Sequence, residues 1–146
     1  MMLLALQMDQ ELAVRMLFKC KSALNYATHA AAQQVDEEKL SRGIHDIDPL
    51  KARQEALFYL RENLRLDEQN EPLPGSVLGS KVEVLAFDVI SGDADFPFVY
   101  VNEEHDFSTV FARPGVVMII RVEYPRVFRM MGPVTWEIKS ASELVY

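Results

Sequence analysis

Two short polar segments of the 146-residue chain contain residue types that can bind a metal ion or move a proton. The first is His45, Asp46 and Asp48, which offers a ring nitrogen and two carboxylates to a divalent metal. The same segment is also typical of a helix start, with Asp48 as the cap and Pro49 in the first turn. We favour the helix start, with the His45 and Asp46 side chains in solvent.

The second polar segment is Glu-Glu-His-Asp at 103–106, and an acidic loop at 93–95 precedes it. A strand expected at 96–102 separates the two loops. A strand of about seven residues spans roughly 23 Å, which is too far for both loops to share one ion. Residues 93–95 also lack the later glycine and glutamate of an EF-hand loop. We interpret both loops as solvated turns.

Cys20 is the only cysteine, so the chain cannot form an internal disulfide or a paired-cysteine metal site. A cysteine nucleophile would need His29, His45 or His105 beside it. Cys20 lies on the apolar stripe of an expected helix, and we predict that it is buried. His29 is more typical of a packed or partner-facing residue than of a catalytic one. Nucleotide-binding, zinc-protease and hydrolase motifs are missing, so we assign no catalytic, cofactor-binding or metal-binding residue and no cofactor.

The chain is acidic, with 22 Asp and Glu against 15 Lys and Arg and a formal net charge of −7. Binding to nucleic acid requires clustered basic residues, and the densest basic stretch is only Arg15, Lys19 and Lys21. Aromatic residues at 96, 98, 100 and 136 lie near acidic loops, so we expect them in the core and not in a base-stacking platform. We therefore predict no nucleic-acid partner.

Apolar spacing predicts two helices in the first half of the chain. Apolar residues recur at intervals of three and four from Ala13 to Ala31, within a helix expected at about 9–37. Gly43 can take a positive φ that closes a helix. A second helix follows at about 49–66, with its buried face at Ala56, Leu57, Leu60 and Leu64.

The second half is rich in β-branched and aromatic residues, which predict strands at 81–90, 96–102, 116–124 and 134–140, with a further short strand at 109–111. The separating turns, among them MMGP at 130–133, are short and favour antiparallel pairing. Alternating apolar residues at 82, 84 and 86 and at 85, 87 and 89 predict two buried faces, and hence a central position for strand 81–90. We expect one α+β domain over 1–146, with a helical part at 9–66 packed on an antiparallel sheet of four to five strands at 77–146.

The chain opens with the apolar run MMLLALQM, residues 1–8. It lacks the basic region and cleavage site of a secretory signal, and eight residues cannot span a bilayer. The run could instead be the end of a membrane anchor that begins upstream of residue 1, with Asp9 and Gln10 marking the exit from lipid. If so, deleting residues 1–8 should leave a folded domain.

The segment KSALNYATHAAAQQVD at 21–36 is similar to the alanine-rich stretch of TadE-like minor pseudopilins. Over residues 3–37, and in the order of its elements, the chain resembles type IV pilin-like proteins. This resemblance implies a non-enzymatic, membrane-anchored structural or assembly protein outside the cytoplasm. Its partners would be the membrane, through a segment upstream of residue 1, and other proteins bound by the N-terminal helix. If the anchor is truncated at residue 1, the apolar residues Leu3, Leu4, Leu6 and Met8 should project from the domain, so we also expect at least weak dimers through the first two turns. The alternative is a soluble, cytoplasmic α+β domain that binds a ligand or acts as an enzyme, with the loops near Asp93 and Glu103 beside a pocket.

Overall fold

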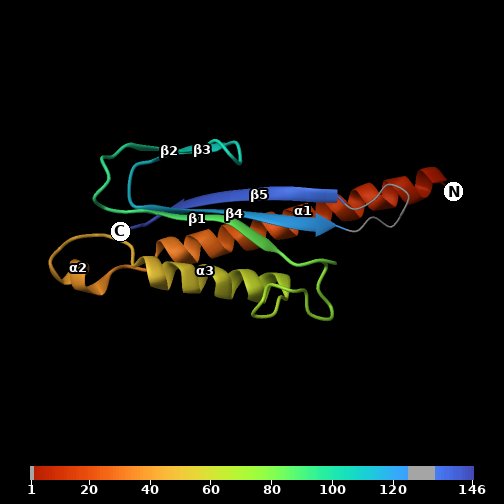
Figure 1. Cartoon of the computed structure of the whole chain (residues 1–146), viewed down its shortest axis with the longest axis horizontal. Helices are drawn as coiled ribbons and strands as arrows, with labels where there is room; N and C mark the ends of the chain where they lie inside the picture. Colours follow the sequence, from red (N-terminus) through yellow and green to blue (C-terminus); the bar gives the residue numbers. More distant parts are fainter. Residues whose placement is uncertain (1, 125–133) are drawn as a thin grey trace.

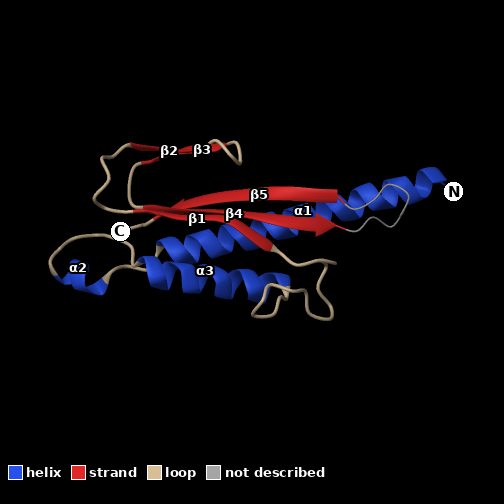
Figure 2. Ribbon diagram, in the orientation of Figure 1, coloured by secondary structure: helices blue, strands red, loops and turns tan. Residues whose placement is uncertain are grey.

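The computed structural model describes residues 2–124 and 134–146, so Met1 and the turn expected at 130–133 lie outside the described residues. Within that part of the chain the fold is α+β, as predicted (Figure 2). Every strand pairing is antiparallel. The elements are α1 (Met2–Ala32), α2 (Glu37–Ser41), α3 (Pro49–Leu64), β1 (Glu83–Ile90), β2 (Phe98–Asn102), β3 (Phe107–Phe111), β4 (Gly115–Tyr124) and β5 (Val134–Glu143).

The strands form two sheets, one of three strands in the order β1-β4-β5 and one made of the β2–β3 hairpin. The central strand is therefore β4, and the prediction that strand 81–90 is central was wrong. β1 lies at an edge, yet both of its faces are apolar because different layers cover them. The helices pack on one face of the three-stranded sheet and the hairpin packs on the other (Figure 1).

A β-bulge in β1 also changes which residues share a face. The register with β4 shifts between Val84 and Ala86, and a bulge inserts one extra residue into the alternation. Val84, Phe87 and Val89 pack toward the helices, while Leu85 and Ala86 pack toward the hairpin. The strict two-residue alternation predicted for this strand was therefore wrong beyond Val84.

The long helix α1 packs on β4 and β5, and α3 lies alongside it. The predicted stripe is confirmed at its centre, where Cys20, Leu24, Ala27 and Ala31 are fully buried. The helix begins at Met2 and ends at Ala32 rather than near residue 37. Beyond the helix, Val35 forms an isolated antiparallel bridge with Ile47.

Local caps set the ends of the shorter helices. Asp36 caps α2, and its carboxylate accepts a hydrogen bond from the Lys39 backbone N–H. Gly43 has the expected positive φ, of 78°, but it follows this short helix and not the long one. Asp48 caps α3 as predicted, and its Oδ1 accepts from the backbone N–H groups of Leu50 and Lys51 at 3.1 and 3.2 Å.

The predicted aromatic residues do pack against the core, on both sides of the sheet. Phe96, Phe98 and Tyr100 are partly buried against a cluster formed by Ile90, Phe111, Val117 and Ile119, which joins the hairpin to the sheet. Trp136 packs against the larger cluster on the helix side. Two apolar layers thus hold the three-stranded sheet between the helices and the hairpin.

A polar seam joins α1 to the edge strand β5. The Thr28 hydroxyl is buried and lies 2.9 Å from the Ser140 hydroxyl. Gln33 Nε2 donates to the Glu143 carbonyl at 3.0 Å, and Lys21 Nζ donates to the Lys139 carbonyl. Free backbone groups on an edge strand can pair with other chains. The side chains of Lys21 on α1 and of Gln33, directly after α1, occupy these two carbonyls of β5.

Candidate functional site

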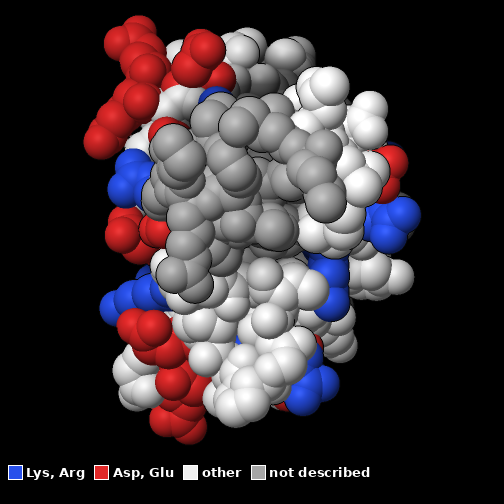
Figure 3. Space-filling view, turned by 90° about the vertical axis from the view of Figure 1, so that its right-hand side faces the viewer, with Lys and Arg blue, Asp and Glu red and all other residues white. Residues whose placement is uncertain are grey.

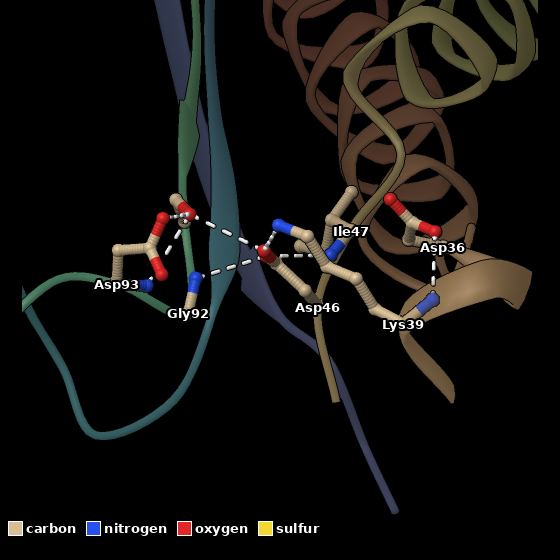
Figure 4. Close-up of polar contacts among 7 residues, drawn as sticks. Asp36, Lys39, Asp46, Ile47, Gly92 and Asp93 are labelled. Atoms are coloured by element: carbon tan, nitrogen blue, oxygen red, sulfur yellow. Dashed lines mark hydrogen bonds and ion pairs between the residues drawn. The ribbon is translucent and has the colours of Figure 1, made fainter. Parts of the chain in front are cut away.

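Asp46 is a buried carboxylate, 2% exposed, that joins the loop before α3 to the turn after β1 (Figure 4). Its Oδ1 accepts from the backbone N–H groups of Ile47 and Gly92 at 2.8 and 2.9 Å. Its Oδ2 accepts from Lys39 Nζ at 2.7 Å and from the Ser91 hydroxyl at 3.3 Å. Four donors thus converge on one carboxylate, which the sequence interpretation had placed in solvent.

The donors around Asp46 keep it ionised. Burial by itself would raise the pKa of Asp46, but the hydrogen bonds from Lys39, Gly92 and Ile47 outweigh burial and lower it below its usual range. The hydrogen bond between Lys39 and Asp46 also raises the pKa of Lys39. A Cβ at Gly92 would lie 3.2 Å from the His45 carbonyl oxygen and 3.4 Å from Asp46 Cγ, so the turn also approaches this carboxylate closely. The Asp46 carboxylate therefore has a structural role: it links α2 and the loop before α3 to the turn after β1, and we call this set of contacts the Asp46 tie.

The other two members of the first polar segment point to different partners. Asp48 caps α3, and the His45 ring stacks on Tyr146 with centroids 3.9 Å apart and an interplanar angle of 1°. The Arg113 guanidinium lies over the Tyr146 ring, 5.3 Å from its centroid. Across residues 2–124 and 134–146, no group of three or more His, Cys, Asp or Glu side chains is placed to hold a metal ion.

A groove of about 560 Å³ lies between β1 and β2. Within it Tyr100 donates its hydroxyl to Asp88 Oδ2 at 2.5 Å, and Asn102 Nδ2 donates to the Tyr100 oxygen at 3.3 Å. Burial and the Asp88 carboxylate together raise the pKa of Tyr100. Glu103 and Glu104 line the same groove, so its polar groups are mainly acidic and hydroxyl oxygens.

The turn at 103–106 is attached to β5 and is not a freely solvated turn, contrary to the sequence interpretation. His105 Nδ1 lies 2.6 Å from Glu137 Oε1, and its side chain is only 9% exposed. Lys139 Nζ donates to the Asp106 carbonyl at 3.2 Å. The hairpin folds back over the sheet, and this brings residues more than thirty positions apart into contact. No spacing in the sequence signals these contacts.

Cys20 is buried as predicted, and burial raises the pKa of its thiol to about 11, against a small opposing effect of Lys19. A thiol in this environment stays protonated at neutral pH and is a poor nucleophile. His29 is exposed on α1, so it is not a packed core residue. Neither residue forms part of a converging reactive group.

The first turns of α1 carry an exposed apolar surface. The helix runs past the ends of the sheet strands and of α3 (Figure 1), and Leu3, Leu4 and Met8 are 78, 61 and 53% exposed. None of the described helices combines the length and the hydropathy that a membrane span requires. Figure 3 views this end of the molecule, where the Lys and Arg side chains in view lie apart from one another among acidic and uncharged residues.

Comparison of the chain with known protein families, with curated proteins and with solved structures finds no match. The structure itself therefore provides three candidate functional features: the Asp46 tie, the acidic groove between β1 and β2, and the exposed face of α1. The sequence drew attention to the residues of the first feature, to Glu103 at the second and to the apolar start of the third.

Proposed function

We propose that this protein is a non-enzymatic structural or assembly domain that acts through its N-terminal helix. The observation that carries the proposal is the apolar surface of α1 around Leu4 and Met8, which projects beyond the sheet. Contiguous exposed apolar surface is typical of a site that binds a protein or a membrane. The pilin-like resemblance of residues 3–37 supports the same role.

The remaining candidate groups have structural partners, which also favours a non-enzymatic role. Asp46 is saturated by four donors, and Tyr100 is paired with Asp88. Cys20 is buried within the helix packing. These surroundings explain the perturbed pKa values of Asp46, Tyr100 and Cys20 without a catalytic function.

Deletion of residues 1–8 tests the assembly role. We expect the wild-type chain to associate in a concentration-dependent way, and the deleted chain to be a folded monomer by analytical ultracentrifugation. The deletion should preserve the fold because Met16 is the first buried residue among the described side chains of α1. Leu50→Gln is the matched control, since Leu50 is an exposed leucine on α3, away from this surface. Unfolding of the deleted chain would assign residues 1–8 to the core and contradict the proposal.

We also propose that the domain is attached to a membrane by a segment upstream of residue 1 and lies outside the cytoplasm. The support is the resemblance together with the exposed apolar start of α1. The native gene product, tagged at its C-terminus, should fractionate with membranes, and the tag should be digested by protease added from outside. A tag found in the cytoplasmic fraction would refute this location.

The absence of a nucleic-acid partner remains a prediction from net charge.

The second candidate function is ligand binding in the groove between β1 and β2, favoured by its volume of about 560 Å³ and its acidic lining at Asp88, Glu103 and Glu104. Such a groove suits a cationic ligand. Metal analysis of the purified protein is the first test. A stoichiometric divalent ion that is lost in Asp88→Asn, but retained in the exposed control Asp93→Asn, would favour this function over assembly.

A further inference from the structure

We propose that α1 pairs with α1 of a second copy in an antiparallel arrangement centred near residue 13. This inference rests on the proposed assembly function and specifies the partner and its orientation. The exposed residues Leu4, Met8, Glu11, Arg15, Phe18 and Ser22 follow one another at alternating intervals of four and three. That spacing places them along a single face of the helix, as in the seam of a coiled coil.

This face is complementary to itself when the second helix runs in the opposite direction. With the centre near residue 13, Met8 lies opposite Phe18 of the second copy, and Glu11 lies opposite Arg15. Each of these pairings occurs twice, because a two-fold axis relates the copies. Met8 and Phe18 are 53 and 71% exposed in the single chain, so the pairing covers two apolar side chains of each copy that the fold leaves in solvent.

The charges on α1 favour the antiparallel direction. Residues 2–12 contain two acidic residues and no basic ones, whereas residues 13–22 contain three basic residues and no acidic ones. A parallel pair in register would place Glu11 beside Glu11 and Arg15 beside Arg15, which is unfavourable. Among the described residues, neither Glu11 nor Arg15 has an ion-pair partner within the chain. Both are therefore available to a second copy.

Within the described part of the chain, the side chains of this face are exposed. The buried side of α1 at Met16, Cys20 and Ala23 faces α3 and the sheet, and the proposed seam lies on the opposite side. The flanking residues Leu12 and Val14 are also exposed, and they come opposite each other in the same register. A second α1 would thus extend the apolar contact along this face.

Charge reversal tests the pairing. Glu11→Arg places arginine opposite Arg15 at both ends of the contact, and we expect the dimer dissociation constant to rise about tenfold or more. Arg15→Glu should have the same effect, and the double swap Glu11→Arg with Arg15→Glu should restore association. Glu62→Arg on the exposed face of α3 is the matched control and should leave the constant unchanged. Weak association of the double swap would overturn the pairing.

A distance measurement tests the direction. Spin labels at Ser22→Cys should lie roughly 27 Å apart along the helix axes, because Ser22 and its symmetry mate are then about 18 residues apart at 1.5 Å per residue. Buried Cys20 does not compete for the label. A separation near 10 Å would indicate a parallel pair, which overturns the inference and leaves the assembly function intact. If the chain stays monomeric at every concentration and cosediments with phosphatidylcholine vesicles, lipid covers this face. That result would overturn both the antiparallel pairing and the assembly function.

Discussion

The most informative perturbation is removal of the Asp46 carboxylate, because this one group links three separate segments. Asp46→Ala removes the acceptor for the Ile47 and Gly92 backbone N–H groups and for Lys39. Ile47 is buried, so its N–H loses its partner without full access to water. Gly92 is exposed and can bond water instead.

The expected cost of Asp46→Ala is about 3 kcal/mol in the free energy of unfolding. Hydrogen bonds to a charged acceptor contribute roughly 1.5–3 kcal/mol each, and water recovers part of the loss at Gly92. Asp46→Asn should cost less, about 1–2 kcal/mol, because Oδ1 keeps its two backbone donors and only the contacts of Oδ2 are lost. For a domain of this size, 3 kcal/mol lowers Tm by roughly 6–12 °C.

The effect also has a defined pH dependence. The pKa of Asp46 in the folded protein lies below its ordinary value of 3.8. The contribution of the ionised carboxylate to the free energy of unfolding is therefore fully present above pH 3.8. The contribution is lost as the pH falls through the lower folded pKa. The difference in unfolding free energy between wild type and Asp46→Ala should be constant from about pH 5 to 8 and should shrink below about pH 4.

Urea denaturation followed by circular dichroism measures these differences. Asp93→Ala is the matched control, since Asp93 belongs to the same turn as Gly92 but is exposed, and it should change stability by no more than about 0.5 kcal/mol. If Asp46→Ala stays within about 0.5 kcal/mol of wild type, the tie does not stabilise the fold. A difference that persists unchanged at low pH would refute the role assigned to the ionised carboxylate.

The packing supports two further substitutions and one labelling experiment. Gly115→Ala should destabilise the fold by about 2–3 kcal/mol in urea denaturation, because a Cβ there would lie 2.5 Å from the backbone oxygen of Ser142; an effect below about 0.5 kcal/mol would contradict this. Cys20 should resist a thiol reagent at pH 8 until the protein is unfolded, and rapid labelling of the native protein would show that α1 opens locally. Thr28→Val should cost about 1 kcal/mol, because it removes the buried hydroxyl contact with Ser140; thermal unfolding unchanged from wild type would remove this contact from the stabilising interactions.

Local sequence determined the elements whose signals lie within a few residues of one another. The Asp48-Pro49 pair predicted the start of α3 because both the cap and the capped N–H groups lie within three residues. The stripe on α1 predicted the burial of Cys20 because helical spacing repeats over several turns. The β-branched runs predicted each strand, and short turns predicted antiparallel pairing.

Tertiary structure alone decided the order of the strands and the surroundings of the polar groups. β1 resembled a central strand because a separate hairpin covers its second face, and apolar residues on both faces carry no information about which layer lies over them. Asp46 and Gly92 are 46 positions apart, and His105 and Glu137 are 32 apart. Contacts at such separations depend on how the hairpin and the loop before α3 fold onto the sheet. If the turn after β1 lay elsewhere, Asp46 would lose its contacts with Ser91 and Gly92.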